Sequence, residues 1–257
     1  MMTEMVRQFK KRLAEGRVVG VFSKTSDPAF IEVMGHGGFD YVIIDLEHGP
    51  NSVETTQNLI RASEVSGIVP IVRVKEKNFS VMGEVLDIGA GGVQVPQVES
   101  AEDAKAVIRR VKFSPAGMRG VCGFVRAAHY SAKDTFRYFK EANETVVILQ
   151  IEGTEGLKNL EPILDVEEID VVFIGPYDLS QSLGVPGKID DPSVTGKMNE
   201  IVKRCIEKDI AVGTFVDTME NARRWIDLGV RYISYSVDVG LFYEKCVEVA
   251  EAIREMK

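Results

Sequence analysis

Side chains that could bind a metal and transfer protons stand where short apolar runs of this sequence end. Glu152 closes the run ILQIE, and Asp178 follows the run VVFIG. Two carboxylates with water suit Mg2+ or Mn2+, which prefer oxygen ligands and keep positions open for a substrate. His48 is a candidate proton-transfer group, because histidine exchanges protons near neutral pH. Arg73 is a permanent cation suited to a carboxylate or a developing enolate oxygen.

Each of these residues also has a plain structural explanation when it is taken alone. An Asp after a strand commonly caps the next helix, so Asp178 or Asp217 alone is more often a cap than a metal ligand. A single Arg in an apolar run, such as Arg73, can be a salt-bridged residue. The set is harder to explain in this way, because burying Arg73, Glu152 and His48 around one site is costly unless they are paired or bind a metal.

Neighbouring residues extend the candidate set. Asp45 or Glu47 could orient the ring of His48, which shares the segment DLEHGP with them. The other histidines are weaker candidates: His36 lies in the turn GHGG, and His129 lies in a long interval between two apolar runs.

Eight apolar runs rich in β-branched residues alternate with helical patterns along the 257 residues. Their nearly continuous apolarity is typical of strands buried on both faces. Strands that alternate with helices imply βαβ units and a parallel sheet, and eight of them in this length predict an α/β fold, the (β/α)8 TIM barrel. An open doubly wound sheet is the alternative, but no GxGxxG motif follows the first strand. The predicted strands are 17–22, 41–45, 69–74, 92–96, 145–152, 170–175, 211–216 and 232–236.

The chain shows no linker or low-complexity tract, so we expect a single barrel domain over 1–257. Catalytic residues of such barrels collect at the C-terminal ends of the strands, where the candidates above stand. The interval 112–143, between the fourth and fifth strands, is an insert that could be functional or an oligomer contact. Helices are predicted over 52–66, 101–111, 193–208, 218–228 and from 241, after a first amphipathic helix within 1–17.

Two kinds of barrel chemistry are not indicated. A Schiff-base aldolase needs a lysine inside the barrel, and the predicted strands contain none, because Lys24 and Lys75 come just after strand ends. Phosphosugar barrels often hold the phosphate in glycine-rich loops after strands seven and eight, whereas these loops read FVDTMEN and SVDVGLF. A metal acting on an unphosphorylated acid fits better.

The composition limits the partners. Lys and Arg number 31 against 39 Asp and Glu, and the resulting net charge of −8 argues against a nucleic-acid binder. The cysteines Cys122, Cys205 and Cys246 form neither a CxxC pair nor a disulfide framework, which suits a reducing cytoplasm. Residues 1–17 lack the continuous apolar stretch of a signal peptide or membrane span. We expect a cytoplasmic protein without membrane or nucleic-acid partners.

Six motifs carry a family resemblance that runs over nearly the whole chain. FDYVIIDLEHGP, IVRV, LDIGAGGVQVPQVES, AGMRGV, ILQIEG and FIGPYDLS, in this order, resemble the HpcH/HpaI family of class II pyruvate aldolases. The resemblance implies a lyase that cleaves or forms 4-hydroxy-2-oxo acids, giving pyruvate and an aldehyde through a metal-stabilised enolate. It also implies a divalent metal ion, Mg2+, Mn2+ or Co2+, and a homo-oligomer, usually a hexamer built as a trimer of dimers.

The resemblance assigns roles to the catalytic and metal-binding candidates. Glu152 and Asp178 match the metal carboxylates of the family. Arg73 matches the arginine that stabilises the enolate, and His48 matches the acid–base histidine, with Asp45 beside it in the motif.

Further matches concern the substrate pocket and the subunit boundary. Gln150 matches a glutamine that contacts the oxo acid, and Gly175 and Pro176 match the segment that receives the pyruvate carboxylate. Asp87 matches an aspartate that in relatives pairs with the histidine across a subunit boundary. Tyr177 departs from the small residue common in GPADLS, which leaves the choice of substrate open.

Another departure and two rival functions remain. The insert reads RGVCGFVRAAHY, where aldolases tend to have small polar residues, so Cys122 and Phe124 would make that pocket wall more apolar. A CoA-ester lyase of the malyl or citryl type shares the barrel and the carboxylate pair, although the histidine of DLEHGP favours the aldolase. A barrel without catalytic activity is the other alternative. The aldehyde and the physiological direction stay open, and both sugar-acid aldehydes and succinic semialdehyde occur in the family.

Overall fold

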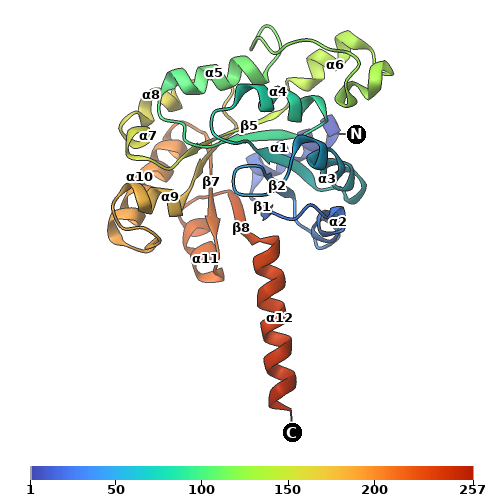
Figure 1. Ribbon diagram of the computed structural model, residues 1–257. Helices are drawn as coiled ribbons and strands as arrows, with labels where there is room; N and C mark the ends of the chain where they lie inside the picture. Colours follow the sequence, from blue (N-terminus) through green and yellow to red (C-terminus); the bar gives the residue numbers. More distant parts are fainter. Residues whose placement is uncertain (1, 257) are drawn as a thin grey trace.

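Eight parallel strands pair in sequence order and close into a barrel in the computed structural model, which describes residues 2–256 (Figure 1). Strand β8 pairs with β1 through Tyr232 and Val18, which completes the ring. The predicted (β/α)8 barrel is confirmed, and an open sheet, which has two free edges, is excluded. The strands are β1 (Val18–Ser23), β2 (Tyr41–Asp45), β3 (Val69–Arg73), β4 (Gly92–Val95), β5 (Val146–Ile151), β6 (Val171–Ile174), β7 (Ala211–Val216) and β8 (Tyr232–Val237).

Both faces of the strands are buried, which explains the continuous apolarity of the eight runs. Inward-facing Ile43, Ile71 and Ile148 fill the barrel, while outward-facing Val42 and Val72 pack beneath the surrounding helices. Burying an aliphatic side chain of this size contributes roughly 1.5–3 kcal/mol. The two layers therefore make the barrel a rigid frame for the side chains at its ends.

Helix α1 (Met2–Glu15) closes one end of the barrel and confirms the predicted amphipathic helix. Its buried face includes Val6 and Phe9. The Phe9 ring lies edge-on to Tyr41, with ring centroids 5.8 Å apart, and Tyr41 stacks on Tyr232 at 4.0 Å. Because both tyrosines begin their strands, α1 covers the N-terminal end and leaves the C-terminal end open.

The outer helices begin close to the predicted positions, because short polar residues cap them. Ser52, for example, accepts a hydrogen bond from the backbone N–H of Thr55 at the start of α3. The prediction omitted α2 and α4, with nine residues each, and the shorter helices α7, α8 and α9. The helices around the barrel are α2 (Pro28–His36), α3 (Val53–Ser66), α4 (Phe79–Asp87), α5 (Ala101–Val111), α7 (Thr154–Lys158), α8 (Leu160–Leu164), α9 (Pro176–Ser182), α10 (Pro192–Glu207) and α11 (Met219–Asp227).

The insert between β4 and β5 folds into a small unit at the closed end of the barrel. It contains the 3-10 helix η1 (Arg126–Ser131) and helix α6 (Thr135–Ala142). A cavity of about 280 Å3 lies between this insert and α1. Since α1 covers the N-terminal end of the barrel, the insert lies on that side, and Cys122 and Phe124 form no wall of the cavity at the open end. The expectation that they line this chain's own pocket is wrong.

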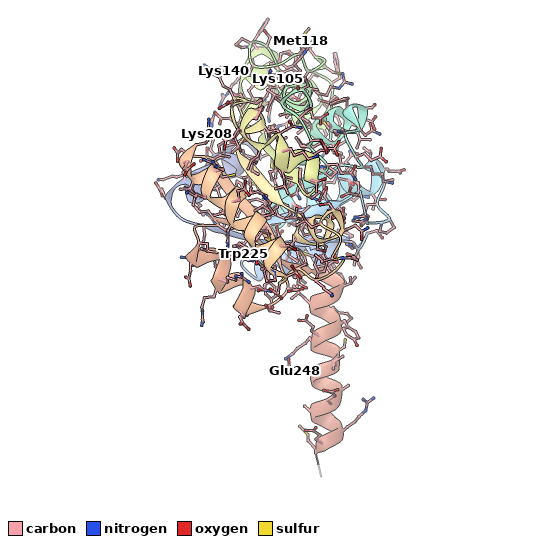
Figure 2. All side chains as sticks on the ribbon, turned by 90° about the vertical axis from the view of Figure 1, so that its left-hand side faces the viewer. Lys105, Met118, Lys140, Lys208, Trp225 and Glu248 are labelled. Carbon is pink, nitrogen blue, oxygen red and sulfur yellow. The ribbon has the colours of Figure 1, made fainter. Side chains whose placement is uncertain are left out.

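Helix α12 (Asp238–Glu255) projects away from the barrel and packs against it only through its beginning (Figure 1). Figure 2 shows the projection from the side, with Glu248 on the part that lies clear of the body. Asp238 is the only residue of this helix that is buried. None of the helices between residues 2 and 256 is both long and apolar enough to cross a membrane.

Candidate active site

A cavity of about 410 Å3 opens at the C-terminal end of the barrel. Its walls come from strand ends that lie far apart in the sequence but adjacent around the barrel. The sequence candidates that line it are His48, Arg73, Gln150, Gly175, Pro176, Tyr177 and Asp178. The fold therefore gathers most of the predicted site residues around one opening.

Arg73 is held between two carboxylates at the end of β3. Its Nε and Nη2 donate to the two oxygens of Asp45 at 2.9 and 2.8 Å. Its Nη1 lies 3.1 Å from Oε2 of Glu47. This arrangement fixes the guanidinium plane, and its face lies 4.8 Å from the centroid of the Phe22 ring. A bidentate pair of this kind restricts the side chain more strongly than a single contact does.

Asp45 supports Arg73 and also the turn that carries His48. Burial opposes the ionisation of Asp45, but the hydrogen bonds and charge of Arg73 outweigh it, so the pKa of Asp45 is lowered. Oδ1 of Asp45 also accepts the backbone N–H groups of Glu47 and His48 at 3.0 and 3.3 Å. The carboxylate thus contacts the backbone beside His48.

His48 stands at the mouth of the cavity rather than inside it. Its side chain is 57% exposed, and its Nε2 lies 4.0 Å from Oε2 of Glu47. The expectation that His48 is buried with Arg73 and Glu152 is wrong, because its side chain lies in the turn after β2 and is more than half exposed at the rim. Glu47 is the carboxylate closer to the ring, so it rather than Asp45 could orient the histidine.

Glu152 lies beneath the cavity at the end of β5. Oε1 accepts the backbone N–H of Gln97 at 2.9 Å, and Oε2 accepts the amide of Gln150. Burial, with the neighbouring charge of Asp178, raises the pKa of Glu152 to about 7. A Cβ added to Gly175 would lie 2.4 Å from Oε2 of Glu152, so only glycine leaves room for this carboxylate.

The carboxylates of Glu152 and Asp178 fit a divalent cation. Each contributes a hard oxygen donor, and their mutual repulsion would be relieved by a positive charge between them. Among residues 2–256, no group of three or more His, Cys, Asp and Glu side chains could hold a metal alone. Two protein carboxylates that leave positions for water and substrate oxygens are typical of Mg2+ and Mn2+.

Gln150 is fixed at both ends of its amide. Its Oε1 accepts the Nε2 of Gln94 at 2.6 Å, and its Nε2 donates to Glu152. The adjacent segment Gly175–Pro176 leads into the first turn of α9, which carries Asp178. Gln150, Gly175 and Pro176 line the cavity together with Asp178, and Glu152 lies behind Gln150.

Tyr177 and Asp217 form a pair on the β6–β7 side of the mouth. The Tyr177 hydroxyl donates to Oδ2 of Asp217 at 2.6 Å. The Tyr177 ring packs edge-on against Phe215, with ring centroids 5.9 Å apart. Burial, together with the hydrogen bond to Asp217, raises the pKa of Tyr177 to about 12, so the hydroxyl keeps its proton.

Asp45, Glu152 and Asp87 are the predicted site residues that do not line this cavity. Asp45 and Glu152 still contact residues that do, Arg73 and Gln150, whereas Asp87 lies away from the site. It ends α4, and because outer helices run antiparallel to the strands, it lies towards the closed end of the barrel. Its Oδ1 accepts Nη2 of Arg119, from the insert, at 2.6 Å. Asp87 therefore does not meet the His48 of its own chain, and pairing across a subunit boundary stays a prediction.

Sequence reasoning missed the aromatic wall of the cavity. Phe22 and Phe215 line it, and the edge-on contacts of Phe22 with Phe173 and Phe215 have centroid distances of 6.1 and 5.9 Å. It also missed the role of Asp238, which accepts the Ser23 hydroxyl at 2.8 Å. Inward alternation along β1 and β7 could have indicated the aromatic residues.

Comparisons with known proteins agree with this geometry. A family profile described as HpcH/HpaI aldolase/citrate lyase matches residues 18–244. A hydroxypyruvate/pyruvate aldolase of Pseudomonas aeruginosa is 33% identical over 95% of this chain and 92% of its own length. A 4-hydroxy-2-oxo-heptane-1,7-dioate aldolase of Escherichia coli is 33% identical over 92% of this chain and 91% of its own length.

A solved structure is similar over almost the whole fold. It is the crystal structure of an HpcH/HpaI aldolase/citrate lyase family protein from Burkholderia cenocepacia J2315, with a TM-score of 0.92 and 30% sequence identity. The match covers 96% of this chain and 99% of the other.

Proposed function

Because this chain belongs to the HpcH/HpaI aldolase/citrate lyase family, we propose that it is a metal-dependent class II aldolase. It cleaves 4-hydroxy-2-oxo acids to pyruvate and an aldehyde, or forms the acids from these two compounds. The observation that supports this most is that Arg73 and Asp178 line the same cavity, with Glu152 directly beneath it. A fixed cation and a metal site can thus act on one enolate.

Glu152 and Asp178 would hold the divalent ion, Mg2+, Mn2+ or Co2+. When bound there, the ion would polarise the 2-oxo group and stabilise negative charge on its oxygen. Gln150, whose amide is fixed by Gln94 and Glu152, would contact the oxo acid. The backbone at Gly175 and Pro176 would receive the carboxylate of the pyruvate half.

Arg73 would stabilise the enolate oxygen through its preorganised charge. Because Asp45 and Glu47 already fix the guanidinium, little reorganisation is needed when negative charge develops. His48, at the mouth, would take the proton of the 4-hydroxyl group as the C3–C4 bond breaks. Glu47, 4.0 Å from its Nε2, would stabilise the protonated ring. Asp87 of a neighbouring copy would pair with this histidine.

Turnover of oxaloacetate tests this function without a choice of aldehyde. Loss of its C4 carboxyl group yields the same pyruvate enolate, so the protein should release pyruvate. We expect activity to disappear when a chelator strips the metal and to return with Mg2+ or Mn2+. Lactate dehydrogenase coupled to NADH oxidation measures the pyruvate. Folded protein that binds the ion but releases none would contradict the aldolase function.

The two rival functions predict no pyruvate release from oxaloacetate and differ from each other in a second test. A CoA-ester lyase would require a CoA thioester and should cleave malyl-CoA or citryl-CoA. A barrel without catalysis would bind the ion and turn over neither class of substrate. His48 and Arg73 at the cavity favour the aldolase over both. We further propose a cytoplasmic location, which suits the exposed thiols of Cys122 and Cys246.

A homo-oligomer is also part of this proposal, and α12 supports it. Val239, Phe242, Cys246, Val249 and Ile253 recur every three or four residues and form one stripe along the helix. All five are exposed, Phe242 and Ile253 by 61% each. Within its own chain the stripe has an aromatic contact only at its start, where Phe242 lies edge-on to Phe30 with ring centroids 6.1 Å apart. A helix gains most of its stability from packing such a face, so the rest of the stripe suits a partner surface.

A second copy offers a matching surface. Two outward residues, Val19 of β1 and Tyr235 of β8, are only partly buried, although Val21 and Ile233 of the same strands are buried. The outward residues of β2 to β6 are all buried. Strands β1 and β8 are those that an eighth barrel helix would cover. Strand β8 continues into α12 without a loop, and the hydrogen bond from Ser23 holds Asp238, its first residue, so the helix leaves the barrel instead of lying over it. We propose that α12 covers β1 and β8 of a neighbouring copy.

Light scattering after gel filtration checks this assembly. The protein should elute as an oligomer, and a hexamer is the state that the family implies. The double variant Phe242→Asp/Ile253→Asp should lower the mass to that of smaller species, because it places two charges in the stripe. Glu251→Ala, on the same helix, is the control and should keep the oligomer. A monomeric wild-type protein at micromolar concentration would refute the proposal.

A further inference from the structure

The barrel order divides the cavity into two halves. Arg73, Gln150, Pro176 and Asp178 come from β3, β5 and the β6 end, so they surround the position of the pyruvate half. The remaining wall comes from the ends of β7, β8 and β1, and its Phe22 ring borders Arg73. In the proposed reaction the aldehyde half must therefore extend towards these three strands.

The inner part of the aldehyde side is apolar. Phe22, Phe215 and Val237 line it and offer no side-chain hydrogen bond. A carbon chain attached to the reacting carbonyl can pack there. Selection by polarity must then come from charged groups further out, and the cavity has two on this side, Lys24 and Asp217.

Lys24 is already directed towards another charge. Its Nζ lies 3.9 Å from Oδ2 of Asp45, which is fully buried, on the β2 side. This carboxylate also accepts two hydrogen bonds from Arg73, so it offsets part of the positive charge of the lysine. Lys24 is therefore a weaker attraction for a substrate carboxylate than its place in the wall suggests.

Asp217 has an oxygen available for a ligand. Its Oδ2 accepts the Tyr177 hydroxyl, whereas within residues 2–256 no hydrogen bond reaches Oδ1 and no salt bridge involves this carboxylate. Tyr177 is itself fixed by its edge-on packing against Phe215. The pair thus holds an ionised, acceptor-only group at the outer end of the aldehyde side.

We propose that Asp217, positioned by Tyr177, selects the aldehyde: it favours a neutral aldehyde with a terminal hydroxyl over one with a terminal carboxylate. This inference rests on the proposed aldolase function. A hydroxyl can donate to Oδ1 of Asp217, and a hydrogen bond to a charged acceptor is stronger than one between neutral groups. A carboxylate would meet a like charge and could donate no hydrogen bond to it.

Two aldehydes of equal length test the selection directly. Glyceraldehyde and 2-hydroxy-3-oxopropanoate differ only in whether the last carbon is a hydroxymethyl group or a carboxylate. Addition of pyruvate to each is followed for the wild-type protein, Asp217→Asn and Tyr177→Phe. Glu220→Gln, the same acid-to-amide change just outside the cavity, is the matched control.

We expect the wild-type kcat/KM to favour glyceraldehyde by at least about tenfold, in the range that one hydrogen-bonding or charged contact provides. Asp217→Asn should reduce the ratio of the two kcat/KM values to about a tenth of the wild-type ratio or less, mainly through KM. Glu220→Gln should keep the wild-type ratio. Tyr177→Phe keeps the ring but frees the Asp217 carboxylate, so it should raise KM for glyceraldehyde with little change in kcat.

Exchange of the pyruvate methyl protons in D2O separates the two possible failures, because it reports the enolate chemistry without any aldehyde. If wild-type protein catalyses exchange but Asp217→Asn keeps the wild-type preference, the inference about Asp217 is wrong and the aldolase function stands. If the wild-type protein prefers the aldehyde with the carboxylate, the inference about Asp217 is also wrong, and Lys24 is the residue that selects the aldehyde. If no exchange occurs with Mg2+, Mn2+ or Co2+, both the aldolase function and the inference about Asp217 are wrong.

Discussion

Arg73→Ala is expected to lower kcat for pyruvate release by about 100- to 1000-fold, the usual effect of removing one preorganised donor from a developing oxyanion. The guanidinium supplies a fixed positive charge at the cavity, and no water molecule can replace that charge. The substitution also leaves Asp45 buried without its partner. Breaking a buried ion pair in this way costs roughly 3–5 kcal/mol of stability, so thermal unfolding must be measured together with kcat.

Arg73→Lys separates the loss of charge from the loss of geometry. A lysine keeps the positive charge but cannot donate to both oxygens of Asp45 and to Glu47 at once. We expect it to restore much of the stability and only part of kcat. The exposed Arg61 offers a control, since Arg61→Ala should change neither quantity. A folded Arg73→Ala protein with the wild-type rate would show that the enolate is stabilised by other groups.

The barrel could be predicted because its signal is local. Each strand is a short, nearly continuous apolar run, and the polar residues that follow mark its end. The short helices α2 and α4 were missed because they are largely apolar, so nine residues show little alternation of polar and apolar faces. Helix α11 has the same length but sets Ala222 and Trp225 among charged residues, and it was predicted. Helix α12 was predicted, but its direction depends on the missing loop after β8 and on the contact between Asp238 and Ser23.

The site was predictable as a set of residues but not as a set of contacts. Asp45 is three residues from His48, and this closeness suggested that it orients the ring. The strand register instead places Asp45 opposite Arg73 on the neighbouring strand. Such a pairing depends on how β2 and β3 align, which spacing along the chain does not contain. Asp87 shows the same limit, because only the direction of α4 reveals which end of the barrel it faces.

The pH dependence of metal binding is expected to follow Glu152. Its pKa is raised to about 7 from the ordinary 4.5, so below that pH the folded protein holds a proton where the cation must bind. Metal affinity should therefore rise by about tenfold per pH unit below pH 7 and level off above it, because binding releases this proton. Calorimetric titration with Mn2+ between pH 5.5 and 8 measures the slope.

The stability of the metal-free protein should show the opposite trend. The pKa of Glu152 is higher in the folded state than in the unfolded state. Between pH 4.5 and 7 the folded protein therefore carries a proton on Glu152 that the unfolded chain has largely lost. Stability without metal should fall as the pH rises through this window, whereas stability with saturating metal should not. The free energies of unfolding from urea titrations at pH 5 and pH 8 give the comparison.

Glu152→Gln provides the decisive variant for both measurements. It keeps the shape of the side chain but removes the charge, so metal affinity should fall by more than about 100-fold, beyond the loss typical of residues that only support a metal ligand. The pH dependence of the remaining affinity should flatten, since no proton leaves on binding. Glu155→Gln, three residues away and exposed, should behave like the wild type. If Glu152→Gln bound Mn2+ with the wild-type affinity and slope, the cation would lie elsewhere, and Glu152 would be a buried acid that serves the fold alone.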